Sequence, residues 1–286
     1  MLVCDRFEIA GGSVSGRSHL LAGKGNQDAY HWSVEEGSLV AVVCDGCGSG
    51  AESEVGAAIG ARLLVAEVSR ALALGGAVDS SALWDEVRAN VLARLSDLVS
   101  AMRGKRSRLV AEMFLFTVVG LAVAKERAVI FAAGDGLFAV GDEVERLGPF
   151  PRNEPPYLGY GLLDEDPLAA SSPRILVHRA FATSELDTVL LGTDGAADLP
   201  DLASRPMPGG EGESVGPLRR FWEEDHHFTN RDAVRRRLAR INREITRPVW
   251  NEKRLAKEPG LLGTTPRSSS SVVVATGAEH ARSNLR

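Results

Sequence analysis

Two short apolar runs that each end in Asp-Gly constrain this chain more than any other feature. "LVAVVCDG" covers residues 39–46, and "TVLLGTDG" covers residues 188–195. Short runs rich in valine and leucine and bounded by glycine are typical of buried β-strands. The runs therefore predict two core strands, with the carboxylates of Asp45 and Asp194 held where those strands end.

Asp-Gly is also a common turn dipeptide, so one such strand end is explained by a turn alone. Two of them, together with Asp28 in "GNQDAYHW" at residues 25–32, favour a site for a hard divalent cation. Such cations take oxygen ligands, and a cation offsets the repulsion between neighbouring carboxylates. The sequence predicts that Asp28, Asp45 and Asp194 come together.

Hydrophobic periodicity predicts helices in the first third of the chain. From Glu52 onward, apolar residues recur every three to four positions, which is typical of a helix with one buried face. A second helix is predicted over 80–102. We expect the buried stripe of the first helix to consist of Val55, Ile59, Leu63 and Ala66.

The middle of the chain is predicted to form strands, and a later segment is predicted to form a basic helix. The segments 113–124, 127–134 and 136–142 predict an antiparallel meander, because tight polar turns separate them. A basic helix is predicted over 230–246, ended by Pro248. Strands and helices alternate in both halves without a linker, which predicts one α+β domain over 1–275.

Composition narrows the function classes. The chain has 286 residues, and the net charge of -5 gives no electrostatic case for nucleic acid as a partner. No apolar run approaches the roughly 20 residues of a membrane span. The N-terminus does not read as a signal peptide, and three cysteines fit a reducing compartment. We expect a cytoplasmic protein without a membrane or nucleic-acid partner.

The Cys-x-x-Cys formed by Cys44 and Cys47 offers a different interpretation, a zinc or thiol site. That site needs further ligands, which Cys4, His19 or His31 would have to supply. A redox Cys-x-x-Cys usually opens a helix, whereas this one straddles a strand end. Cys44 is expected to point away from Asp45 on the pleat and into the core, which favours the carboxylate interpretation.

Four motifs occur in an order that resembles a known family. They are "NQDA" (26–29), "VVCDGCGSG" (42–50), "GDGLFAV" (134–140) and "LLGTDGAADL" (190–199). This order resembles metal-dependent Ser/Thr protein phosphatases of the PP2C type, in a bacterial branch. The resemblance covers about 20–275. It implies a four-layer α-β-β-α sandwich of two antiparallel sheets flanked by helices.

The resemblance also implies roles for individual residues. Asp45 would bridge two Mn²⁺ or Mg²⁺ ions, the Gly46 carbonyl would bind one of them, and Asp194 would be a terminal ligand. Asp198 would assist a third, weaker ion. Asp28 would order metal-bound water, and a hydroxide shared by the metals would attack phosphorus in line.

One position departs from the family pattern, and one further aspartate is given no role in the metal site. The family often has an arginine five residues before the aspartate of "NQDA" to hold substrate phosphate, and this chain has Gly23 there. Lys24, His19 and Arg17 are the candidates to replace that arginine. Asp135, in the "GDG" turn, is interpreted as structural.

The largest departure lies near the C-terminus. The family ends in a motif of the type "DDxTLVVV", whose first aspartate is a metal ligand, whereas this chain reads "GLLGTTPRSSSSVVVAT". It has no aspartate after Asp232. Thr264 or Ser268 occupies the approximate place, and a hydroxyl is a weaker ligand for a hard cation. Metal affinity and activity should therefore be reduced.

Two accounts of this departure stay open. The codons GAC GAC ACC ACG CTC GTC GTC GTC encode Asp-Asp-Thr-Thr-Leu-Val-Val-Val, and reading them one base late gives Thr-Thr-Pro-Arg-Ser-Ser-Ser, the residues at 264–270. A frameshift near Thr264 would make the tail from 275 foreign to the fold, and we expect 276–286 to be disordered. In the other account the ligand was lost by divergence, and "VVVAT" is the last core strand.

These observations leave two functions. The first is a metal-dependent phosphatase that hydrolyses phosphoserine and phosphothreonine in proteins, impaired by the missing aspartate. The alternative is a catalytically weak or inactive phosphatase-like module that binds a partner such as a Ser/Thr kinase.

Overall fold

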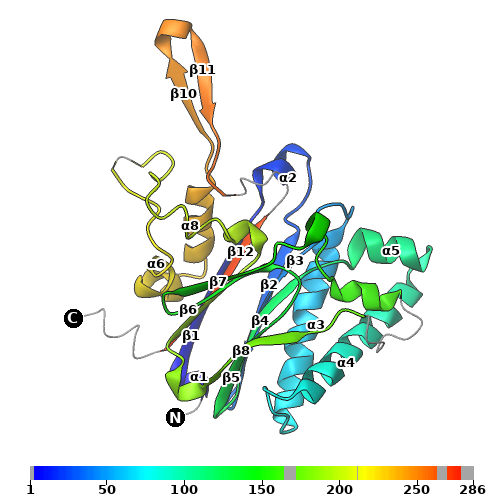
Figure 1. Ribbon diagram of the computed structural model, residues 1–286. Helices are drawn as coiled ribbons and strands as arrows, with labels where there is room; N and C mark the ends of the chain where they lie inside the picture. Colours follow the sequence, from blue (N-terminus) through cyan, green and yellow to red (C-terminus); the bar gives the residue numbers. More distant parts are fainter. Residues whose placement is uncertain (1–2, 164–171, 211, 263–268, 278–286) are drawn as a thin grey trace.

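The strands form two five-stranded antiparallel sheets (Figure 1). The computed structural model describes residues 3–163, 172–210, 212–262 and 269–277. The β3 sheet contains, in order, β2 (Asp28–Val34), β3 (Leu39–Asp45), β4 (Val118–Val123), β5 (Arg127–Ala133) and β8 (Leu176–Ala182). The β9 sheet contains, in order, β1 (Phe7–Val14), β12 (Ser270–Gly277), β9 (Thr188–Gly192), β6 (Gly136–Val140) and β7 (Glu143–Leu147).

The two sheets pack face to face through an apolar layer. Val43 and Val119 from the β3 sheet join Leu191 and Val273 from the β9 sheet in one buried cluster. Alternate residues along each strand face this layer or the helices outside it. The predicted α+β class is therefore confirmed, with the α-β-β-α layer order that the resemblance implies.

Helices cover the outer face of each sheet (Figure 1). The β3 sheet is covered by α3 (Ser53–Ala73), α4 (Ser81–Ala101) and α5 (Arg106–Met113). The β9 sheet is covered by α6 (Arg220–Glu223), α7 (His226–Thr229) and α8 (Ala233–Ile241). The remaining short helices are α1 (Val3–Arg6), α2 (Arg17–Leu21), η1 (Pro151–Asn153), η2 (Leu158–Leu162), η3 (Thr183–Glu185), η4 (Asp194–Ala196) and η5 (Trp250–Glu252). Within the described ranges, none of the helices has the length and apolar character needed to cross a bilayer.

The buried face of α3 differs from the predicted stripe. Val55 is exposed, whereas Ala57, Gly60 and Ala61 are buried against the β3 sheet. A Cβ atom on Gly60 would lie 2.3 Å from the ring of Phe116, so small residues let this helix approach the sheet closely. The prediction selected hydrophobic side chains, whereas the buried face of α3 is formed by small residues that carry little hydrophobicity.

The predicted meander over 113–142 is confirmed for its first two segments and wrong for the third. β4 and β5 pair in the β3 sheet, but β6 pairs with β7 and β9 in the other sheet. The chain crosses between the sheets at Gly134 and Gly136, both of which have positive φ angles. The short turn "GDG" is therefore a crossover and not a hairpin.

The basic helix is also shorter than predicted. It ends at Ile241, and Pro248 lies within β10 (Ile245–Val249), which pairs with β11 (Arg254–Glu258). This two-stranded hairpin projects away from the sandwich (Figure 1). Proline is tolerated there because a two-stranded ribbon leaves one edge of each strand unpaired.

The C-terminal strand is a central element of the β9 sheet. β12 lies between β1 and β9, and Val272, Val273 and Val274 are buried. The strand continues through Gly277, so the disorder expected at 276 and 277 is wrong for those two residues. The rest of that tail and the position of Thr264 and Ser268 lie outside the described residues. The packed valines are what the divergence account expects.

Candidate functional site

The three predicted aspartates come together where the two sheets meet. Asp28 begins β2 and Asp45 ends β3, and the antiparallel register places them directly opposite each other. Asp194 follows β9 of the other sheet as the first residue of η4. The β2–β3 register and the packing of the two sheets therefore bring one carboxylate that follows β9 to two from the β3 sheet.

Asp45 occupies the middle of this cluster. Its carboxyl group lies close enough to those of Asp28 and Asp194 for their charges to interact. Burial, and then the neighbouring Asp28 and Asp194 charges, raise the pKa of Asp45 well above its usual range. Asp45 is therefore the member of the cluster whose charge interacts with both of the other aspartates.

The other two aspartates are also destabilised as anions. Burial, with a contribution from the charge of Asp194, raises the pKa of Asp28 to about 7. Burial likewise raises the pKa of Asp194, and the nearby Asp198 adds to the rise. Carboxylates that are this close and this buried favour a bound cation, since positive charge restores their ionised form.

Thr193 fixes the position of Asp28. Its hydroxyl donates a hydrogen bond of 2.5 Å to Asp28 Oδ2 and accepts one of 3.0 Å from the backbone N–H of Ser271. These bonds connect β2, β9 and β12. The second oxygen of Asp28 and the Oδ1 of Asp194 are buried without a hydrogen-bond partner among the described residues. Those two orphaned oxygens fit a divalent cation, which takes oxygen ligands.

The glycines after Asp45 and Asp194 are required by close backbone approach. A Cβ atom on Gly46 would lie 2.7 Å from Ser53 O, and one on Gly195 would lie 1.8 Å from Ser269 O. Neither glycine has a positive φ angle. Each Asp-Gly pair therefore packs directly against the backbone of another segment, and this packing fixes the position of the aspartate.

Two further acidic residues lie near the cluster. Asp198 is half-buried and close enough to Asp194 to raise its pKa. Burial, and then the charge of Asp194, raise the pKa of Asp135 to about 6. Asp135 sits in the crossover between the sheets, close enough to Asp194 for their charges to interact.

The candidate phosphate-binding residues have different surroundings. Lys24 donates through Nζ to Gly48 O (2.7 Å) and Gly50 O (3.4 Å), so it holds the loop that follows Asp45. The buried His19 lies 3.0 Å through Nδ1 from Ser269 Oγ, and its charge would lower the pKa of Asp194. Arg17 begins α2, and its side chain lies outside the described part of the structure.

Comparison with known proteins settles the family. A family model described as "Protein phosphatase 2C" matches residues 15–241, which is most of the chain. The chain belongs to the protein phosphatase 2C family. A search of curated proteins finds no match.

Several solved structures resemble the fold at low identity. A bacterial serine phosphatase has a TM-score of 0.49 and 13% identity, covering 94% of this chain and 97% of its own. Serine/threonine phosphatase Stp1 from Staphylococcus aureus has a TM-score of 0.47 and 14% identity, covering 96% and 95%. The catalytic domain of PstP, in complex with two manganese ions, has a TM-score of 0.46 and 14% identity, covering 95% and 98%.

The cysteines of this PP2C family member lie on either side of the strand end. Cys44 is fully buried beneath α3, as predicted from the pleat, and burial raises its pKa well above the usual range. Cys47 lies in the following loop with its sulfur 3.1 Å from Ser49 Oγ. Both are free thiols. Within the described ranges, the one set of three ligand atoms that all lie within 4.8 Å of one another includes neither cysteine, and it does not include Asp28, Asp45 or Asp194.

Three serines, Ser269 to Ser271, stand at the start of β12. Ser269 contacts His19, and Ser270 Oγ donates a 2.8 Å hydrogen bond to Gly195 O. Ser271 Oγ donates a 2.7 Å hydrogen bond to Ser13 Oγ of β1. These hydrogen bonds link the start of β12 to α2, η4 and β1. They hold this segment in place without a carboxylate.

Sequence reasoning missed the residues that support the aspartates. Thr193 stands directly before Asp194 in "GTDG", and its position at a predicted strand end was the available signal. Gln27 Nε2 donates a 2.6 Å hydrogen bond to Ser53 Oγ, which fastens the "NQDA" motif to the start of α3. These partners are 26 and 165 residues apart in the sequence, so local patterns do not reveal them.

Proposed function

We propose that this chain is a divalent-cation-dependent phosphatase that hydrolyses phosphoserine and phosphothreonine in proteins. The observation that supports the proposal most strongly is the convergence of Asp28, Asp45 and Asp194, with buried oxygens that lack partners. Membership of the protein phosphatase 2C family supports the same reaction class.

Each carboxylate has a proposed role in this reaction. Asp45, Asp194 and the Gly46 carbonyl hold the cations, and Asp198 assists at the edge of the cluster. Mn²⁺ or Mg²⁺, when bound there, supplies the Lewis acidity that phosphate hydrolysis needs. Asp28, held by Thr193, orients the attacking water through its free Oδ1.

His19 is the proposed contact for substrate phosphate. It is buried, close to Asp194, and belongs to α2, which lies next to the cluster. Lys24 is less suited because its ammonium group already donates to two loop carbonyls. We expect Lys24 to support the cluster by holding the 46–50 loop, and Arg17 to contribute positive charge from the same helix as His19.

The proposed setting follows from the same observations. Phosphoproteins are the proposed substrates, and a Ser/Thr kinase that produces them is the proposed partner. The free thiols of Cys44 and Cys47 support a reducing compartment, the cytoplasm. Residues 1–275 are proposed to act as one domain, because β1 and β12 pair along their whole length.

A direct test uses an aryl phosphate and Mn²⁺. The wild-type chain is expected to release phosphate, and Asp45→Ala is expected to abolish the release. The matched control is Asp142→Ala, an exposed aspartate in the β6–β7 turn, which should keep wild-type activity. Equal rates for wild type and Asp45→Ala would remove the proposal.

One observation favours a second function, a phosphatase-like binding module with little turnover. Ser269, Ser270 and Ser271 stand at the entry of β12, and the chain has no aspartate after Asp232. A cluster short of one carboxylate binds cations more weakly. This alternative predicts Mn²⁺ binding without phosphate release even at saturating Mn²⁺, together with retention of a phosphorylated partner.

A further inference from the structure

Three metal-ligand side chains gather on the outer face of the β9 sheet. Glu224, His226 and His227 each offer one ligand atom, and these atoms all lie within 4.8 Å of one another. His226 Nδ1 is 3.7 Å from Glu224 Oε2, and the two imidazole rings are 4.2 Å apart between centroids. The cluster occupies the junction of α6 and α7, helices that pack on β12 and β1.

His227 is the unusual member of this cluster. It is only 1% exposed, and neither ring nitrogen has a hydrogen-bond partner in the described part of the structure. A neutral imidazole carries a lone pair on one ring nitrogen, and that lone pair can bind a metal ion. A buried imidazole without any partner is costly, and a metal ion would supply the missing one.

Arg237 and Arg220 both lie near the Glu224 carboxylate, but they do not occupy all of its metal-binding capacity. Arg237 Nη1 lies 3.4 Å from Glu224 Oε1 and 3.3 Å from Oε2, and Arg237 Nη2 also donates to Val215 O at 2.8 Å. Arg220 is 3.9 Å from the same carboxylate. Glu224 can therefore keep one oxygen on Arg237 and turn the other, Oε2, toward the two imidazoles.

We propose that Glu224, His226 and His227 form a second metal site, selective for Zn²⁺ or a similar transition ion. Two imidazoles and one carboxylate are a ligand set that Zn²⁺ accepts, with the fourth position left to water. Hard ions such as Mg²⁺ prefer a site made only of oxygens. The two sites therefore differ in the chemistry of their ligands, and this proposal stands apart from the phosphatase function.

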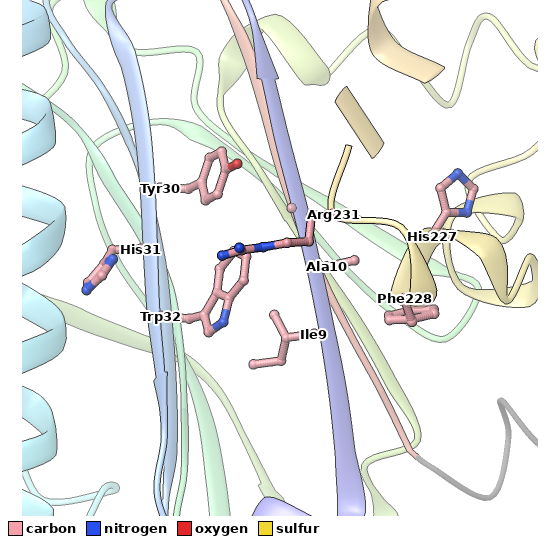
Figure 2. A pocket seen from close by; sticks show the side chains of 9 residues that line it. Ile9, Ala10, Tyr30, His31, Trp32, His227, Phe228 and Arg231 are labelled. Atoms are coloured by element: carbon pink, nitrogen blue, oxygen red, sulfur yellow. The ribbon is translucent and has the colours of Figure 1, made fainter. Parts of the chain in front are cut away.

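A metal here would hold in place a segment that lines a cavity beside β1. That cavity has a volume of about 400 Å³ and lies between β1, β2 and the α7 region. Figure 2 shows Arg231 reaching toward Tyr30 and Trp32 of β2, with His227 and Phe228 on the far side of β1. Zn²⁺ bound at His227 would hold this wall of the cavity in place.

The test is Zn²⁺ binding to the full chain by equilibrium dialysis, with excess Mg²⁺ present to occupy the oxygen-ligand cluster. Wild type is expected to bind one Zn²⁺ per chain. Loss of a ligand should weaken binding by more than about 100-fold, since even supporting residues cost 10- to 100-fold. His226→Ala is the main variant because His226 is exposed and the fold does not depend on it.

Two controls make the result decisive. Glu224→Gln removes the carboxylate charge at constant size and should weaken Zn²⁺ binding, whereas His178→Ala removes an exposed histidine of β8 and should leave it unchanged. Zn²⁺ should also raise the melting temperature of wild type but not of His226→Ala. Absence of Zn²⁺ binding by wild type, or unchanged binding in His226→Ala, would overturn the proposal.

Discussion

Replacing Asp28 with asparagine should stabilise the metal-free protein while it removes a functional group. The folded state raises the pKa of Asp28 from 3.8 to about 7, mainly by burial. The unfolded chain therefore releases this proton first, and the folded protein loses stability as the pH rises from about 4 to about 7. The rise in the pKa of Asp28 corresponds to a loss of roughly 4 kcal/mol in the free energy of unfolding. This value is an upper limit because the three aspartates titrate as a unit.

The asparagine variant lacks this ionisation and keeps an oxygen to accept from Thr193. Urea unfolding in a chelator should therefore show Asp28→Asn more stable than wild type by about 1 to 4 kcal/mol at pH 8. The two proteins should be nearly equal at pH 4. Added Mn²⁺ should reverse the order at pH 8, because it stabilises the ionised cluster of wild type more.

The matched control for this prediction is Asp142→Asn, an exposed aspartate, which should shift stability by less than about 0.5 kcal/mol at either pH. A variant that is less stable than wild type at pH 8 in the chelator would refute the reasoning. It would mean that Asp28 is stabilised as an anion by the protein alone, and the argument for a cation would then lose its electrostatic basis.

Three further substitutions test the surroundings of the cluster. Thr193→Val keeps the side-chain shape but removes the hydroxyl bonded to Asp28, and urea unfolding should show a loss of about 2 to 4 kcal/mol. Gly195→Ala places a Cβ against the Ser269 carbonyl, and the same assay should show a loss of about 1 to 3 kcal/mol or more. Ser269→Asp adds a carboxylate at the start of β12, and calorimetric titration should show tighter Mn²⁺ binding, by about tenfold.

Each of these substitutions has a control in the chain. Thr193→Ser keeps the hydroxyl and should retain most of the stability, and Gly37→Ala, with no atom near its Cβ, should change stability little. Ser269→Asn has the size of aspartate without its charge and should not improve Mn²⁺ binding. If Thr193→Val matched wild type, or if Ser269→Asn matched Ser269→Asp, the corresponding role would be wrong.

The convergence of Asp28, Asp45 and Asp194 could be predicted because each residue marks the end of a strong local pattern. A buried strand followed by Asp-Gly is visible in about eight residues, and the family resemblance implied that the three aspartates share one metal site. The layer architecture followed from the same information. The prediction succeeded where short-range hydrophobic pattern and long-range position agreed.

The errors arose where tertiary packing overrode local pattern. Gly60 and its neighbours carry little hydrophobicity, yet their small size brings α3 onto Phe116. The "GDG" turn around Asp135 reads as a hairpin, but β6 pairs with β9 from a distant part of the chain. Pro248 reads as a helix stop, whereas it lies in a projecting hairpin.

The measurement closest to the central claim is a crystal structure of the wild-type chain grown with saturating Mn²⁺ and recorded at the manganese absorption edge. We expect anomalous peaks at coordination distance from the carboxylates of Asp45 and Asp194, with Asp28 adjacent. An ordered cluster of these three aspartates without manganese beside Asp45 would contradict the account.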